Sequence, residues 1–162
     1  MTAPNYIRWF RELSLTDLPL VGGKNASLGE MVRELACQGV KVPDGFAITA
    51  AAFRHFIREA GLDEHIRATL ADLDTHDMAN LSERGQAVRQ AILNATLPAD
   101  LQTLIVEAYR QLQGPSTTPL DVAVRSSATA EDLPDASFAG QQETYLNVHG
   151  AAALLETCKR CF

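Results

Sequence analysis

The sequence has 162 residues, of which 46% are hydrophobic and 21% charged, and its formal net charge is −6. These proportions are typical of a soluble globular protein and exclude a disordered chain. The negative charge gives no electrostatic support for binding to nucleic acid or to a membrane surface, and no apolar run approaches the roughly 20 residues that cross a bilayer. No secretory signal is visible, and the three cysteines do not form a disulfide framework, so we expect a cytoplasmic protein.

Hydrophobic periodicity predicts short strands and amphipathic helices in the first two thirds of the chain. In chain order, the expected elements are a strand over Ile7–Leu13, a helix from Gly22 to about Gln38, a strand over Phe46–Ile48, and helices over Thr49–Gly61, Asp63–Leu73, Ser82–Ala95 and Pro98–Leu112. Thr49 is expected to cap the second helix, and Gly39 to end the first. The side chains expected to face the core are Leu28, Met31, Val32 and Leu35, then Phe53, Phe56, Ile57 and Ala60, and finally Leu101, Leu104, Ile105, Ala108 and Leu112.

A linker over residues 114–119, rich in Gly, Pro, Ser and Thr, separates this helical section from a β-rich segment. In that segment, two β-type runs, Val122–Val124 and Glu143–Val148, flank a loop of small and polar residues. The sequence then stops inside an amphipathic helix with no residue to cap it, which indicates a chain cut short. The expected fold class is α/β (α+β), with a helical section plus a mixed β-sheet.

Arg125, at the end of the first β-type run, is the strongest candidate for binding a phosphate group. Its planar guanidinium can hold phosphate oxygens through two parallel hydrogen bonds. The small residues of the run Ser126–Ala130 let backbone amides approach the same anion. The alternative is an ordinary ion pair with Glu131 or Asp132. We favour a nucleotide phosphate, because so many small side chains suit wrapping an anion better than packing a core.

Lys24 follows two glycines at the expected start of a helix, where unpaired amides and the helix dipole attract anions. The alternative is an ordinary Gly-Gly turn with a solvated lysine. The segment is not a Walker A loop, because Leu18 stands where that motif has its first glycine and Asn25 follows the lysine. Two residues after the Arg125 loop complete the candidate site: Gly140 would let the backbone approach a ligand, and the hydroxyl of Thr144 could reach a phosphate or a metal-bound water.

The remaining chemically active residues favour structural roles. The carboxylates of Glu131, Asp132 and Asp135 could hold Mg²⁺, but a solvated loop explains them better. Cys158 and Cys161 have C-x-x-C spacing without a second pair or a nearby histidine, so they fit a helix face better than a zinc site. The four histidines share no carboxylate or cysteine context; they are His55, His65, His76 and His149. We therefore assign no catalytic residue and no metal ligand to this chain.

Three long motifs in the same order, Val21–Met31, Val42–Thr49 and Val122–Val148, closely resemble the start of the phosphoenolpyruvate synthase (pyruvate, water dikinase) family. The resemblance implies the N-terminal portion of an ATP-grasp, pyruvate-phosphate-dikinase-type nucleotide-binding domain over residues 1–162, using ATP and Mg²⁺. In that family ATP phosphorylates a histidine on a swivelling domain, and this phosphohistidine then phosphorylates pyruvate on a C-terminal barrel. The products are AMP, phosphate and phosphoenolpyruvate, as gluconeogenesis requires.

Carried over by motif position, Lys24 and Arg125 would contact the ATP phosphates, and Gly140 and Thr144 would line the same site. The other half of the ATP-grasp domain, with the acidic metal ligands, would follow Phe162, and the phosphohistidine and pyruvate-binding barrel domains are absent. We therefore expect this chain alone to be inactive, and any oligomer to form through the missing domains. Two alternatives stay open: the ATP-binding part of a related dikinase such as a rifamycin phosphotransferase, or a non-catalytic truncated binding module.

Overall fold

The computed structural model describes residues 5–129, 132–133, 136–137 and 143–162, with side chains placed for all of these except 132–133 and 136–137. The helices are α1 (Leu18–Val21), α2 (Gly23–Ala36), α3 (Ala50–Glu59), α4 (Leu62–Leu70), α5 (Met78–Asn94), α6 (Ala99–Gln113) and α7 (Ala151–Cys161). The strands are β1 (Ile7–Trp9), β2 (Phe46–Ile48), β3 (Asp121–Arg125), β4 (Asp132–Leu133), β5 (Ala136–Ser137) and β6 (Thr144–His149). None of the described helices combines the length and the apolar character needed to span a lipid bilayer.

Strand β1 pairs antiparallel with β2, with Ile7 opposite Ile48 and Trp9 opposite Phe46. The strand predicted over Ile7–Leu13 is therefore too long, because the chain turns into a 3₁₀ helix, η1 (Phe10–Glu12), directly after Trp9. This turn carries Leu13 into the interior, where its side chain is almost completely buried. Burial of that leucine explains why the strand ends early.

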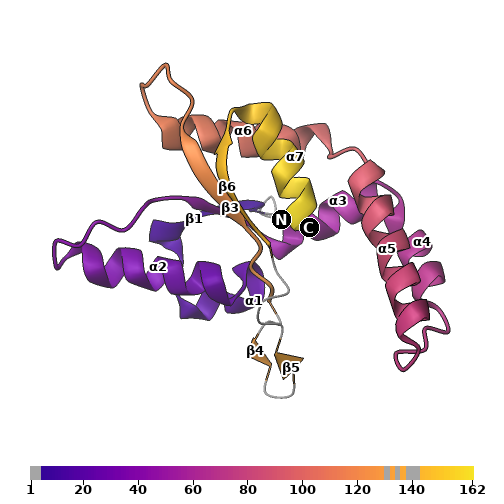
Figure 1. The fold of residues 1–162 in the computed structure, drawn as a ribbon. Helices are drawn as coiled ribbons and strands as arrows, with labels where there is room; N and C mark the ends of the chain where they lie inside the picture. The colour runs from indigo at the N-terminus through magenta and orange to yellow at the C-terminus, as the bar shows by residue number, and fades with distance from the viewer. Residues whose placement is uncertain (1–4, 130–131, 134–135, 138–142) are drawn as a thin grey trace.

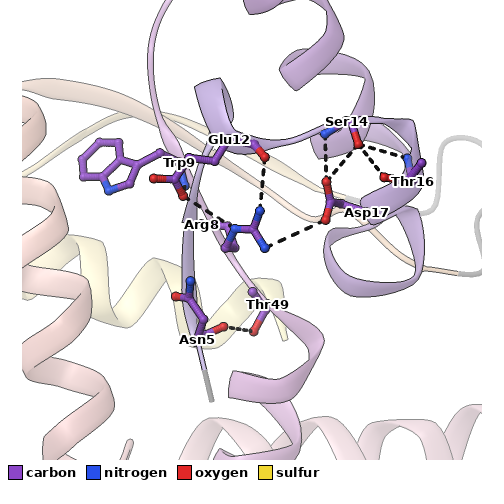
Figure 2. A network of polar contacts seen from close by, with 8 residues as sticks. All are labelled: Asn5, Arg8, Trp9, Glu12, Ser14, Thr16, Asp17 and Thr49. Atoms are coloured by element: carbon purple, nitrogen blue, oxygen red, sulfur yellow. Dashed lines mark hydrogen bonds and ion pairs between the residues drawn. The ribbon is translucent and has the colours of Figure 1, made fainter. Parts of the chain in front are cut away.

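A polar network around Arg8 holds the two turns that precede α1 (Figure 2). The guanidinium of Arg8 lies 3.6 Å from a carboxylate oxygen of Glu12 and 3.9 Å from one of Asp17. Asp17 in turn accepts hydrogen bonds from the backbone amide of Ser14 at 2.9 Å and from its hydroxyl at 3.1 Å. Because Asp17 immediately precedes α1, this network fixes where α1, and then α2, begin.

Helix α2 begins and ends close to its predicted bounds, and Gly39 follows it with a φ of 78°. Its buried face differs from the prediction: Ala26 and Gly29 are buried, whereas Met31 is 46% exposed. A Cβ at Gly29 would lie 2.6 Å from the Cβ of Leu13. The helix therefore packs through its smallest residues, because only these allow its backbone so close to the preceding segment.

The predictions for β2 and α3 are confirmed. The hydroxyl of Thr49 accepts a hydrogen bond from the amide of Ala52 at 3.4 Å, as an N-cap does, and Gly61 follows α3 with a φ of 66°. Phe56 and Ile57 are buried. The cap of α5 was missed, because Asp77 accepts from the amides of Ala79 and Asn80 and so starts the helix four residues earlier than predicted.

The main core lies where α3 and α6 meet β6 and α7 (Figure 1). Its buried members are Ala52, Phe56, Ile57, Ile92, Leu97, Leu101, Ile105, Tyr109, Val148, Leu154 and Cys158. In α6 the predicted core residues Leu101, Ile105 and Ala108 are buried, but Leu104 is 38% exposed. Tyr109, which was not predicted to face the core, is buried.

Strands β3 and β6 form the antiparallel ribbon that carries Arg125. Two residues of β6, Leu146 and Asn147, lie opposite Ala123, and Asn147 adopts a φ of 55° at this bulge. Every sheet that the structure describes consists of two antiparallel strands. The fold is mixed α/β, as predicted. Over the described residues, however, the strands form separate antiparallel pairs and not the mixed β-sheet that was expected.

Tyr109 ties α6 to the far end of this ribbon. Its buried hydroxyl donates to the carbonyl of Leu120 at 2.6 Å, just before β3, and accepts from the amide of Gly150 at 3.0 Å, just after β6. One side chain therefore satisfies a backbone group next to each of the two strands.

Replacing Tyr109 with Phe should lower the free energy of unfolding by about 1–2 kcal/mol, because two partly buried backbone groups lose their partner. Urea unfolding of the purified chain measures this loss. Tyr6→Phe is the matched control, since no described residue hydrogen-bonds to the Tyr6 hydroxyl, and it should change stability little. Equal stability of wild type and Tyr109→Phe would contradict the assignment.

Candidate functional site

The N-terminus of α2 and the loop after β3 meet, although they are 102 residues apart in sequence. The backbone amide of Asn25 donates a hydrogen bond to the Ser127 hydroxyl at 3.2 Å. The Asn25 side-chain amide also donates to the carbonyl of Val21 at 2.9 Å, which fixes the turn between α1 and α2. We call this meeting point, formed by residues 22–25 and 125–129, the α2–β3 junction.

Gly22 makes the junction possible in two ways. Its φ of 79° and ψ of 165° lie in a region that is almost exclusively populated by glycine. In addition, a Cβ at this position would lie 2.2 Å from the carbonyl oxygen of Ser127 and 2.5 Å from its hydroxyl oxygen. Any side chain would therefore separate the helix from the loop.

The junction brings together the backbone positions of the two predicted phosphate-binding cations. Lys24 is the second residue of α2 and is half-buried, and Arg125 ends β3 with an exposed side chain. Within the described part of the chain, Arg125 makes no ion pair. Of the carboxylates considered as its alternative partners, Glu131 and the side chain of Asp132 lie outside the described residues.

Thr144 lies directly opposite Arg125 in the β3–β6 ribbon. Both side chains are exposed, whereas Val122 and Val124 on the other face of β3 pack against the core. Residues directly opposite in an antiparallel pair share one face, so the guanidinium and the hydroxyl emerge on the same side. Gly140, the fourth predicted residue, lies outside the described residues, and its role stays a prediction.

A hollow of about 1580 Å³ opens beside the junction. At this end its lining includes Asn25, Arg125, Ser127 and Thr129, and apolar side chains of β2 and α3 continue it. Of the predicted site residues, Arg125 borders the hollow, while Lys24 and Thr144 do not. The sequence-based site missed Asn25. The signal in the sequence was a helix that starts with glycine and has no local residue to cap it.

Glu143 places a negative charge at the same end of the hollow. It accepts a hydrogen bond from the Tyr145 hydroxyl, and this bond raises the pKa of the Tyr145 phenol above its ordinary value. The carboxylate therefore has a hydrogen-bond partner two residues further along the chain, in β6.

The other candidate groups have structural environments. Burial raises the pKa of the Cys158 thiol to about 12 and that of Cys161 to about 11, so neither is a reactive thiolate at neutral pH. His55 lies 3.0 Å from Asp100, and the ring of His149 lies 3.2 Å from Asp121. The described residues contain no group of three His, Cys, Asp or Glu side chains that could hold a metal ion.

Comparison with known proteins places these features in a family. Residues 18–162 match the family model described as pyruvate phosphate dikinase, AMP/ATP-binding domain. The chain belongs to this family. The matched range contains both halves of the α2–β3 junction.

Individual relatives agree with the family match. The chain is 58% identical over 161 residues to a phosphoenolpyruvate synthase of Synechocystis sp., a match that covers 96% of this chain and 20% of the relative. It is 51% identical to the phosphoenolpyruvate synthase of Aquifex aeolicus, covering 96% of this chain and 18% of the relative, and 47% identical to that of Escherichia coli, covering 96% and 20%. The chain thus spans about a fifth of the length of these relatives.

Gly22→Ala should lower the free energy of unfolding by at least about 2 kcal/mol, because it combines backbone strain with a clash against Ser127. Gly150→Ala separates the two effects, since Gly150 has nearly the same backbone conformation, with a φ of 83° and a ψ of 153°, but nothing lies within 4 Å of its added Cβ. The control should therefore cost less, about 1 kcal/mol. Urea unfolding of both variants measures the difference, and equal losses would show that the close approach to Ser127 contributes nothing.

Proposed function

We propose that this chain is the ATP-binding portion of a phosphoenolpyruvate synthase, built as part of an ATP-grasp domain. The parent enzyme would convert ATP, pyruvate and water to AMP, phosphoenolpyruvate and phosphate through a phosphohistidine, in the cytoplasm and in the service of gluconeogenesis. The name of the matched family and the names of the relatives support the proposal. The structural observation that carries it is the α2–β3 junction, where the segments that contain Lys24 and Arg125 meet.

In this proposal the junction receives the triphosphate. Arg125 would hold phosphate oxygens through its two-pronged guanidinium, and Lys24 would add a second positive charge at the start of α2. The helix dipole favours negative charge at the same place. Two cations in this position would stabilise the charge that develops on the phosphoryl group during transfer.

Thr144 and Gly140 complete the proposed site. The hydroxyl of Thr144, which emerges beside Arg125, would donate to a phosphate oxygen or to a metal-bound water. Gly140 would allow a close approach of the backbone to ATP. Both roles come from the resemblance by motif position, and the pairing of Thr144 with Arg125 supports the first.

Mg²⁺ would accompany ATP and neutralise part of the charge on its phosphates. By the family resemblance, its acidic protein ligands would lie in the other half of the ATP-grasp domain. We likewise propose that the histidine that accepts phosphate and the pyruvate site belong to other parts of the enzyme. Any oligomer would form there too. The partners of this chain would be small molecules rather than nucleic acid or a membrane.

Arg125→Ala should weaken binding of Mg-ATP to the 162-residue chain by about tenfold or more, because it removes a charge-assisted contact to a phosphate. Lys24→Ala should weaken it as well. Isothermal titration calorimetry measures both. Arg110→Ala and Lys41→Ala are matched controls, since both side chains are exposed, lie outside the junction and do not line the hollow. If Arg125→Ala bound as tightly as wild type, the assignment of the phosphate site would be wrong.

The chain on its own should form no AMP from ATP in response to pyruvate, because the proposed phosphate-accepting histidine and the pyruvate site are not part of it. A coupled assay of AMP release, with and without pyruvate, tests this expectation. If the purified chain formed AMP in a pyruvate-dependent reaction, the proposal that the phosphate-accepting histidine and the pyruvate site lie in other parts of the enzyme would be wrong.

A further inference from the structure

The N-terminus of α2 is capped from a distant part of the chain. Its own N-cap residue, Gly22, has no side chain, and the third residue of the helix, Asn25, donates its amide to Ser127 instead. A hydroxyl that accepts from the third amide is what a serine at an ordinary N-cap provides. The first turn of α2 is therefore completed by the loop that follows β3.

Ser127 is held on two sides. Its hydroxyl oxygen accepts from the Asn25 amide at 3.2 Å, and its carbonyl group and hydroxyl fill the space where Gly22 would otherwise carry a Cβ. A shift of the loop toward α2 is blocked by the Gly22 backbone, and a shift away breaks the hydrogen bond. The position of Ser127 relative to α2 is thus fixed in both directions.

We infer that Ser127 is a positioning residue for the nucleotide site, an inference that rests on the proposed function. Ser127 lies two residues after Arg125, and its partner Asn25 directly follows Lys24. One hydrogen bond therefore sets the spacing between the two segments that carry the proposed phosphate-binding cations. Ser127 acts through this spacing, and the cations make the contacts to ATP.

A competing role for the same hydroxyl predicts the opposite result. If Ser127 occupied the place that a phosphate takes at the helix N-terminus, it would compete with ATP, and its removal would tighten binding. If it positions the two segments, its removal leaves the Asn25 amide without its acceptor and releases the loop, so binding weakens. The sign of the change in affinity separates these two roles.

The test compares Mg-ATP binding by wild type, Ser127→Ala and Ser127→Thr in the 162-residue chain, together with the amide resonance of Asn25 by NMR. Ser127→Ala should weaken binding on the order of fivefold and shift the Asn25 resonance, because the cap is lost. Ser127→Thr keeps a hydroxyl and should restore both. Asp77→Ala removes the cap of α5, which Figure 1 shows on another side of the molecule from α2, and should leave affinity unchanged.

Each other outcome overturns the inference. Unchanged or tighter binding by Ser127→Ala excludes a positioning role, and equal weakening by Ser127→Thr excludes a role for the hydroxyl. If Asp77→Ala weakened binding equally, a general loss of stability would explain the weaker binding by Ser127→Ala. Failure of wild type to bind Mg-ATP would instead overturn the proposed function itself, and the inference would fall with it.

Discussion

The close approach of Gly22 to Ser127 is the constraint on which the arrangement of the candidate site depends. It holds a helix start and the loop after a strand together through one hydrogen bond and the absence of one side chain. Such a contact is specific because it tolerates neither a larger residue nor a shifted loop. It also needs both partners to be held independently by the rest of the fold.

The two sides of the junction are held by different means. On the helix side, the Arg8 network fixes the turns before α1, and the contact between Leu13 and Gly29 seats α2. On the strand side, the core packs against the inner face of the β3–β6 ribbon, and the Tyr109 hydroxyl holds its far end. The junction therefore joins two structures that are each ordered by their own contacts.

Local patterns were sufficient to predict much of this fold. Helix α3 was recognisable because Thr49 and Gly61 mark its ends and its buried residues recur at helical spacing. Hydrophobic periodicity predicted the wrong buried face for α2, where small residues make the contact. Met31 fits the periodicity but is exposed, whereas Ala26 and Gly29 are buried. Hydrophobicity scales rank the large residue higher, but a close helix contact requires the small ones.

Local sequence patterns indicated the two segments of the candidate site separately, but they did not indicate that the segments meet. The composition of the loop after Arg125 indicated an anion site, and the glycines before Lys24 indicated a helix start. No local signal connects the two, because the hydrogen bond between Asn25 and Ser127 is encoded only by the tertiary fold. The family resemblance supplied the connection that spacing and periodicity could not, and it also supplied the roles that remain proposals.

The single extra residue in β6 decides which side chain accompanies Arg125. With uninterrupted pairing from Asp121 and His149, the arginine would lie opposite Tyr145, whereas the inserted residue moves Thr144 into that place. Asn147 absorbs the insertion because an asparagine tolerates a left-handed backbone at low cost. This small irregularity thus places a compact threonine instead of a bulky tyrosine next to the guanidinium of Arg125.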